Sequence, residues 1–408
     1  MIRQRQPGMM TGITLLLPVT LAAMAIVLLA PNLPQMLREF SGVAGYEYLV
    51  PMILTIPALC IALLSPLAGI LGDYFGRRRL LLASFALYAG IGILPIFLHD
   101  LSSILVSRIG VGVAEALIMV LSTTMIGDYY RGVARDKWLA GQTAFASISA
   151  VVFLNVGGQL GSFGWRAPFW AYLSALGMMA LVVLFTWEPR GEPNEMAESA
   201  AAPHNLRWTG FPWPQMLTVL AITMVSAVFF YTVPIQSSNA LSLLGLTDPA
   251  QVGFLTSIAS VGVPIGTLVY ARAGRTPVRR LLMIEFATLA VGYAVMGQAT
   301  SPTVFLIGCF VNQVGAGALL PTLLVWTMSF LKFEVRARGA GLWQSAFAFG
   351  QFLSPVTVTF VANKAGGLQA VFIVFAATAV IGSGILALVV RRFGSVRPEA
   401  APPAALHG

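Results

Sequence analysis

Charged residues are scarce in this sequence. Only 10% of its 408 residues are Asp, Glu, Lys or Arg, while 57% are apolar and the mean hydropathy is +0.83. Soluble domains average about 25% charged and about 45–50% apolar residues. The composition therefore excludes an ordinary soluble enzyme and is typical of a protein whose solvent is a lipid bilayer.

Cysteine and histidine are also rare. Cys60 and Cys309 lie far apart within apolar runs, so they indicate neither a disulfide framework nor a cluster of metal ligands. The histidines His99, His204 and His407 fall in a loop, in a polar linker and in the tail. Without a buried nucleophile and base, or a glycine-rich loop for phosphate, we expect no enzyme activity, no cofactor and no metal.

Long apolar stretches, in contrast, are abundant. A helix needs about 20 residues to cross the hydrocarbon core. Twelve stretches of suitable length occur, at residues 12–35, 49–71, 80–98, 102–126, 139–161, 167–187, 214–236, 251–271, 281–299, 303–330, 340–362 and 367–390. Backbone polar groups in lipid must bond internally, and the stretches show no two-residue alternation. We therefore expect an all-α integral membrane protein with twelve transmembrane helices.

Basic residues are distributed unevenly among the loops. When loops are assigned to alternate sides of the membrane, one side holds 20 of the 24 Lys and Arg residues. The other side holds Arg38, Arg166 and Lys364, and Arg108 lies inside a span. The positive-inside rule then predicts a multi-pass plasma membrane protein, in a bacterial inner membrane, with both termini in the cytoplasm. The net charge of +9 reflects this topology, so we expect no nucleic-acid partner.

The sequence divides into two halves. Residues 188–213 form the only long polar stretch between spans and are rich in Pro, Ala and Glu, which indicates a cytoplasmic linker. The segments QTAFA (142–146) and QSAFA (344–348) open the fifth and eleventh spans, 202 positions apart. This repeat predicts six-helix bundles over 1–187 and 214–396, related by an axis along the membrane normal. Residues 397–408 are expected to be a disordered cytoplasmic tail.

The turn between the second and third spans carries a motif. It reads GILGDYFGRRR over residues 69–79, in which small residues permit a tight helix–turn–helix and arginines can anchor to headgroups. This turn resembles the G-x-L-x-D-x-x-G-R-[KR] signature of the major facilitator superfamily, with Gly69, Asp73, Gly76, Arg77 and Arg78 at the motif positions. The twelve spans, the linker and the repeat extend the resemblance over nearly the whole chain.

The resemblance implies a transporter that works by alternating access. The turn would help to latch the outward-facing state, with Asp73 pairing across the two halves or with the loop after the fourth span. Asp128 and Arg135 follow that span in a pattern similar to the family's, and Arg336 repeats it after the tenth span. We interpret these residues as gating charges; the alternative is that they only anchor the chain to headgroups.

Two charged residues lie within the fourth span. Arg108 and Glu115 are seven residues apart, which places them on one helix face about 10 Å apart, too far for a direct ion pair. The segment resembles the family's R-x-x-x-G-x-[GA] motif, which is associated with proton coupling. Glu115 would carry the proton, and Arg108 would tune it or meet an anionic substrate; the alternative is a structural pair. Glu285, inside the ninth span, is interpreted as structural.

Polar and aromatic residues inside apolar spans outline an expected substrate cavity. By the family's arrangement, spans 1, 4, 7 and 10 and their partners 2, 5, 8 and 11 line the central path. The candidates on these spans are Asn32, Gln35, Asn155, Gln159, Tyr231, Gln236, Asn312, Gln313, Trp326, Gln344 and Gln351. For each of them, a hydrogen-bonding contact between helices is an equal alternative.

Two short segments bear on the direction of transport. APNLPQ at residues 30–35 is similar to a motif of twelve-span drug exporters, whereas FLNVGG at 153–158 keeps only the last two glycines of the G-P-x-x-G-G antiporter signature. The resemblance is thus to the drug:proton antiporter branch. We expect proton-coupled efflux of an amphipathic compound by a monomer whose partners are the solute, protons and the bilayer. Proton-coupled uptake of an organic anion and a non-transporting sensor are the alternatives.

Overall fold

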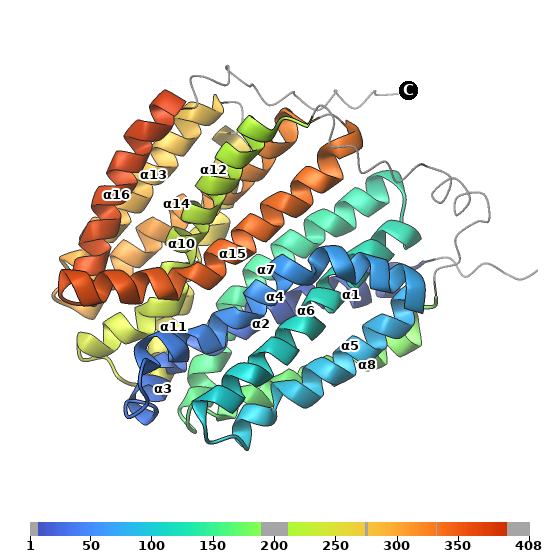
Figure 1. Cartoon of the computed structure of the whole chain (residues 1–408), viewed down its shortest axis with the longest axis horizontal. Helices are drawn as coiled ribbons and strands as arrows, with labels where there is room; N and C mark the ends of the chain where they lie inside the picture. Colours follow the sequence, from blue (N-terminus) through green and yellow to red (C-terminus); the bar gives the residue numbers. More distant parts are fainter. Residues whose placement is uncertain (1–6, 189–210, 274–275, 332, 390–408) are drawn as a thin grey trace, which may run out of the picture.

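The computed structural model describes residues 7–188, 211–273, 276–331 and 333–389, and all regular structure in these ranges is helical (Figure 1). The first part of the chain contains α1 (Met9–Leu16), α2 (Val19–Val27), η1 (Ala30–Asn32), α3 (Leu33–Glu39), α4 (Tyr46–Phe75), α5 (Arg77–Gly92), η2 (Leu94–Ile96), α6 (Leu101–Tyr129), α7 (Gly132–Gly161), η3 (Ala167–Leu173) and α8 (Ser174–Phe185). The second part contains α10 (Trp213–Leu243), α11 (Pro249–Ser260), α12 (Gly262–Ala273), α13 (Val278–Gly297), α14 (Pro302–Ser329), α15 (Phe333–Ala365) and α16 (Leu368–Val389). The predicted all-α class is confirmed.

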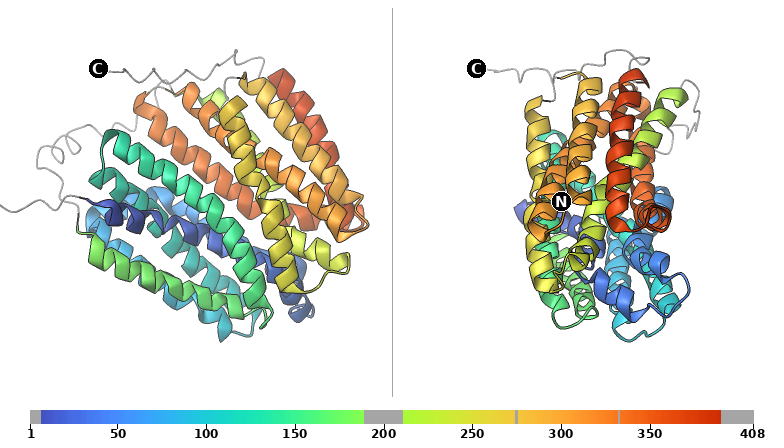
Figure 2. Two further views of the ribbon diagram at one scale, coloured as in Figure 1. Left: turned by 180° about the vertical axis from the view of Figure 1, so that it is seen from behind. Right: turned by 90° about the vertical axis from the view of Figure 1, so that its left-hand side faces the viewer.

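Within the described residues, eleven helical segments are long and apolar enough to cross a membrane. Helix α7 adds a shorter apolar stretch, Phe145–Gly161, which brings the number close to the expected twelve. The first span is interrupted near Pro18 and Pro31, because proline lacks the N–H group that continues the helical hydrogen bonds. The helices run broadly along one direction of the molecule (Figure 2).

The buried apolar side chains form two clusters. One extends from Leu15 to Val182 and includes Ile235, and the other lies between Phe211 and Leu386. Helices α5, α6 and α8 lie on one side of the molecule, and α13, α14 and α16 lie on the other (Figure 1). Each part of the chain thus builds its own core. The domain boundaries stay predictions, because residues 189–210 of the linker and all of the tail at 397–408 lie outside the described ranges.

The two parts also repeat a specific hydrogen bond. The hydroxyl of Tyr88 in α5 donates to the carbonyl of Leu21 in α2 at 3.2 Å. The hydroxyl of Tyr293 in α13 donates to the carbonyl of Phe229 in α10 at 2.5 Å. In both cases the hydrogen bond ties the third span of a half to the first span of that half.

The halves meet along two pairs of helices, α4 with α15 and α7 with α11 (Figure 1). At the second pair the backbones touch, since a Cβ atom on Gly158 would lie 2.8 Å from the Cα of Gly253.

We name two ends of the bundle: the basic end holds the α4–α5 turn, and the opposite end holds α3 and the α10–α11 turn. At the opposite end, Thr359 Oγ1 donates to the carbonyl of Glu47 at 3.2 Å and joins the halves.

Candidate functional site

Arg108 of α6 is fully buried within the first half. Its Nη2 atom donates to the carbonyl of Gly92 at 3.2 Å. Its Cζ atom lies 5.0 Å from the ring centroids of both Phe169 and Tyr172, a distance at which the ring faces attract a cation. Within the described part of the chain, Nε and Nη1 have no hydrogen-bond partner. The cation is therefore enclosed by aromatic rings and one carbonyl.

Gly92 makes this enclosure possible. It is the last residue of α5, so its carbonyl has no partner within the helix and is free to accept from Arg108. A Cβ atom at this position would lie 2.4 Å from the ring of Tyr172. A larger residue would push the ring away from the guanidinium group.

Glu115 lies on the same helix and is 1% exposed. Its Oε2 atom has no hydrogen-bond partner among the described residues, and no ion pair joins its carboxylate to Arg108 there. The charge of Glu115 acts electrostatically on Arg108, on Cys60 of α4 and on the hydroxyl of Tyr231, which belongs to α10 of the other half. The two charges are thus near each other without neutralising each other by contact.

Tyr231 is part of an aromatic group on the second half. Its ring centroid lies 4.9 Å from that of Phe230 and 5.5 Å from that of Phe347 in α15. Phe347 in turn stacks on Trp343, with centroids 5.7 Å apart and planes 9° apart. These rings form an apolar wall from α10 and α15 whose polar tip, the hydroxyl of Tyr231, is within electrostatic reach of Glu115.

Three of the predicted cavity residues bond the backbone of a neighbouring helix in their own half. Asn32 and Gln35 donate from their side-chain amides to carbonyls of α7, at 3.0 and 3.2 Å. Asn312 donates in the same way to a carbonyl of α13 at 3.3 Å. In this structure these amides connect helices, which is the alternative that the sequence left open.

The other predicted cavity residues differ in burial. Gln236, Gln313 and Trp326 are buried, and Gln313 donates to the side chain of Asn312 at 3.5 Å. Asn155, Tyr231 and Gln351 are half-buried, whereas Gln159 and Gln344 are exposed.

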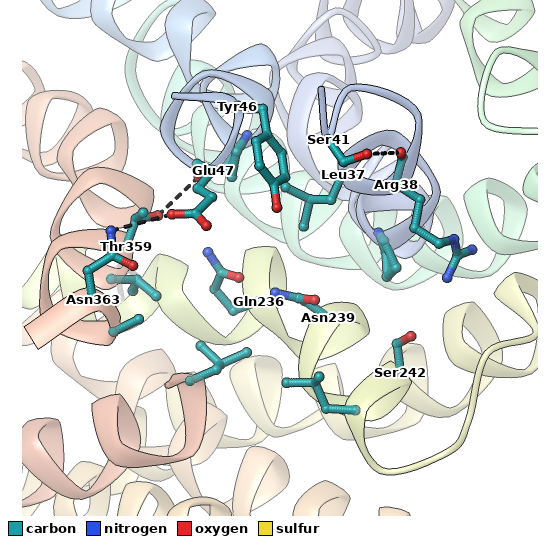
Figure 3. A pocket seen from close by; sticks show the side chains of 16 residues that line it. Leu37, Arg38, Ser41, Tyr46, Glu47, Gln236, Asn239, Ser242, Thr359 and Asn363 are labelled. Atoms are coloured by element: carbon teal, nitrogen blue, oxygen red, sulfur yellow. Dashed lines mark hydrogen bonds between the residues drawn. The ribbon is translucent and has the colours of Figure 1, made fainter. Parts of the chain in front are cut away.

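A cavity of about 490 Å³ lies at the opposite end (Figure 3). Its walls come from α3 and α4 of the first half and from α10 and α15 of the second. Gln236 belongs to its lining, together with Asn239, Arg38 and Glu47. Sequence reasoning did not select Arg38 or Glu47, although Arg38 is one of only three basic residues assigned to that side of the membrane.

At the basic end, Arg77 connects two carboxylates. Its Nη2 atom lies 2.8 Å from Oδ1 of Asp73, and its Nη1 atom bonds Asp128 at the end of α6. Asp73 was expected to pair across the halves or with the loop after the fourth span. Its partner in the structure is instead Arg77, four residues along the chain, and Arg77 supplies the link to Asp128. The ion pairs of Arg77 with Asp73 and Asp128 connect α4, α5 and α6 of the first half.

The neighbouring arginines tie the same turn to the end of α8. The carboxylate of Glu188 accepts from the backbone N–H groups of Arg78 and Arg79 at 3.2 and 3.3 Å and so satisfies the free donors at the start of α5. Arg78 also donates from Nη2 to a carbonyl of α8 at 3.1 Å. Gly76 adopts a φ of 89°, a conformation that favours glycine.

Three further residues were predicted to take part in gating. Gly69 lies in α4 with open space beside its Cα atom. Arg135 is exposed near the start of α7. The side chain of Arg336, in α15, lies outside the described residues.

Comparison with known proteins gives consistent results. The sequence model of the Major Facilitator Superfamily matches residues 15–248 and 216–407. A bacterial homolog of the human lysosomal transporter Spinster, in an inward-facing and unoccupied conformation, is similar in structure, with a TM-score of 0.75 and 15% identity over 96% of this chain and 99% of that chain.

Two further solved structures are similar over almost their whole length. A mutant of the peptide transporter POT in complex with alafosfalin has a TM-score of 0.73 and 16% identity, covering 97% of this chain and 98% of that one. A D-xylose–proton symporter has a TM-score of 0.73 and 16% identity, covering 92% and 96%. At such identities, these likenesses show the fold alone.

Proposed function

Since this chain belongs to the major facilitator superfamily, we propose that it is a secondary active transporter that couples a small organic solute to protons through Glu115. It moves the solute by alternating access, as a monomer in a bacterial inner membrane, with the basic end in the cytoplasm. Twenty of the 24 basic residues fall on that side, in support of this orientation.

The proposal rests on the burial of the Glu115 carboxyl group inside the membrane-spanning region. A charged side chain near the bilayer centre costs at least about 2.5–3.5 kcal/mol on insertion scales. Glu115 is 1% exposed and has no ion pair in the described part of the chain, so binding a proton removes that cost. Arg108 places a positive charge on the same helix face without contacting the carboxylate. A carboxyl in this setting can exist with or without its proton as the surroundings change during transport.

The aromatic wall supports an amphipathic solute. Tyr231, Phe347 and Trp343 offer ring faces for an apolar body close to the carboxyl that releases the proton. This arrangement favours proton-coupled efflux over uptake of an organic anion. An anion would need Arg108 as its anchor, and that side chain is fully buried between Phe169 and Tyr172.

The contacts between the halves support alternating access. The backbones of Gly158 and Gly253 touch toward the opposite end, while α12, which continues α11 toward the basic end, contacts α7 much less. This is the arrangement expected when the path opens at the basic end. Rocking the halves about these contacts would expose Glu115 to the two sides in turn.

Proton flux in liposomes tests the proposal. Purified protein and Glu115→Gln are compared under an imposed pH gradient while lipophilic cations and organic anions are added one at a time. We expect at least one compound to drive proton movement with the unaltered protein and none with the variant. Opposite movement of protons and solute indicates antiport, and parallel movement indicates symport. Equal coupling in both proteins would remove Glu115 as the coupling residue.

A further inference from the structure

The cavity at the opposite end lies at the junction of the two halves, away from Glu115. Its volume of about 490 Å³ is within the range of about 300–1,000 Å³ found for small-molecule sites. Helices α3 and α4 form one wall and α10 and α15 form the other, so an occupant would contact both halves (Figure 3).

Two side-chain amides on α10, those of Gln236 and Asn239, line this cavity. Gln236 is only 3% exposed, and its amide makes no hydrogen bond with the described residues. Asn239, three residues along the helix, also lines the cavity without a hydrogen bond in the described part. Figure 3 shows both amides directed toward the side chains of α3 and α4. Amide groups that line a cavity and bond no neighbouring side chain or backbone group are suited to bond the polar atoms of an occupant.

Opposite charges lie on two sides of the same cavity (Figure 3). The guanidinium group of Arg38 forms no ion pair within the described residues. The carboxylate of Glu47 accepts from the neutral amide of Asn363, at 3.4 Å, and has no cationic partner in the described ranges. The lining therefore offers one positive and one negative group, neither of which has a counter-charge among the residues that the structure describes, together with two amides.

We propose that this cavity binds a small zwitterion. Its carboxylate contacts Arg38, its ammonium group contacts Glu47, and the amides of Gln236 and Asn239 bond its polar atoms. Arg38 and Glu47 belong to the first half and the amides to the second, so the bound zwitterion holds the opposite end closed. This site goes beyond the proposed coupling at Glu115 and does not depend on it.

Calorimetric titration of the purified full-length protein in detergent tests the site. The probes are ω-amino acids of increasing length, from glycine to 8-aminooctanoate, with hexylamine and hexanoate as probes that carry one charge each. We expect one chain length to bind best, at least about tenfold more tightly than either single-charge probe, because only it satisfies both charges at once. Binding of no ω-amino acid, or binding equal to that of hexylamine or hexanoate, would overturn the proposal.

Single substitutions test which charged group of the ω-amino acid contacts Glu47 and which contacts Arg38. Glu47→Gln should reduce binding of the best ω-amino acid to the level of hexanoate, and Arg38→Gln should reduce it to the level of hexylamine. Lys364→Gln is the matched control, since Lys364 lies at the same end but does not line the cavity. Equal weakening by Arg38→Gln and Lys364→Gln, which each remove one positive charge, would show a general charge effect and reject the site. Loss of this binding would leave proton coupling through Glu115 unaffected, so the two proposals fail separately.

Discussion

The two halves of this transporter have the same scaffold and different interiors. Tyr88 and Tyr293 each tie the third span of their half to its first span. Each also stacks on a ring of the last span, Tyr172 at 5.1 Å in one half and Phe372 at 6.2 Å in the other. The packing of the outer helices is therefore repeated, down to single hydrogen bonds.

The charged residues of the fourth span are not repeated. An offset of 203 positions relates the fourth and tenth spans, and it places Val311 at the position of Arg108 and Ala318 at that of Glu115. The second half thus forms the same scaffold with apolar residues at both places. It follows that the fold does not require the two charges, which supports a role for them in transport.

The second half has a buried carboxylate of its own. Glu285 in α13 is 3% exposed, and its Oε1 atom accepts from the hydroxyl of Thr322 at 2.5 Å. It lies in the ninth span, which the family arrangement places outside the central path. Two buried carboxylates thus differ in position: Glu115 is within electrostatic reach of the opposite half, and Glu285 is bonded within its own half.

The largest difference in proton-coupled flux is expected between the two variants in which one of these carboxylates is neutralised. Glu115→Gln should lower proton-coupled flux by about 100-fold or more, whereas Glu285→Gln should change it by less than about threefold. Initial rates of proton movement in liposomes with equal amounts of protein measure both. Similar losses in the two variants would contradict a coupling site confined to the first half.

A second large difference in flux is expected between Arg108→Met and Val311→Met, which change equivalent positions of the two halves. Methionine fills the space of the arginine stem, so Arg108→Met should reduce flux about tenfold through loss of the positive charge near Glu115. Removing a buried charge also removes its desolvation cost, so stability should change by no more than about 1 kcal/mol. Val311→Met should leave flux nearly unchanged.

Melting temperatures in detergent, measured beside the flux, separate the two possible roles of Arg108. If Arg108→Met lost flux and stability together, the arginine would belong to the scaffold. Retained stability with lost flux would assign it to transport.

The sequence predicted the spans well because length and apolar content decide whether a helix crosses a bilayer. It also brought Arg108 and Glu115 to one face of α6, since helical spacing is fixed. The sequence did not predict whether the side chains of Asn32 and Asn312 point toward a neighbouring helix or toward the central path. Whether a polar side chain faces a neighbouring helix or the central path depends on how the helix is rotated in the bundle, and an apolar span carries no strong periodic signal for that rotation.

The cavity at the opposite end was missed for a related reason. Arg38 lies near the end of α3 and Glu47 near the start of α4 in the first half, whereas Gln236 and Asn239 lie in α10 of the second half. They come together only because the halves dock, and docking depends on close contacts such as that between α7 and α11. No local pattern in one sequence reports such a contact between distant segments.

A smaller loss of stability, of the same size in both halves, is expected when the hydroxyl group of Tyr88 or of Tyr293 is removed. Tyr88→Phe and Tyr293→Phe each remove one buried hydrogen bond to a backbone carbonyl, so each should lower stability by about 1 kcal/mol. Thermal unfolding in one detergent measures both. Losses that differ strongly would show that the two scaffolds are less equivalent than their contacts indicate.

The smallest loss of stability is expected from a substitution of Asp73 at the basic end. Asp73 occupies the position that Tyr270 takes in the second half, where the corresponding stretch has no carboxylate. The side chain of Asp73 is 65% exposed and that of Arg77 is 28% exposed, so water and salt screen their ion pair. Asp73→Asn should therefore lower stability by no more than about 0.5 kcal/mol.

Flux then decides what this ion pair does. If Asp73 gates transport, Asp73→Asn reduces flux while the melting temperature stays within the range of Tyr270→Phe, its counterpart in the second half. If Asp73→Asn destabilises the protein as much as Tyr88→Phe does, the pair is part of the scaffold of the first half. In that case the two halves would differ in how their basic ends are held together, and the absence of a carboxylate at Tyr270 would be a structural difference with no bearing on gating.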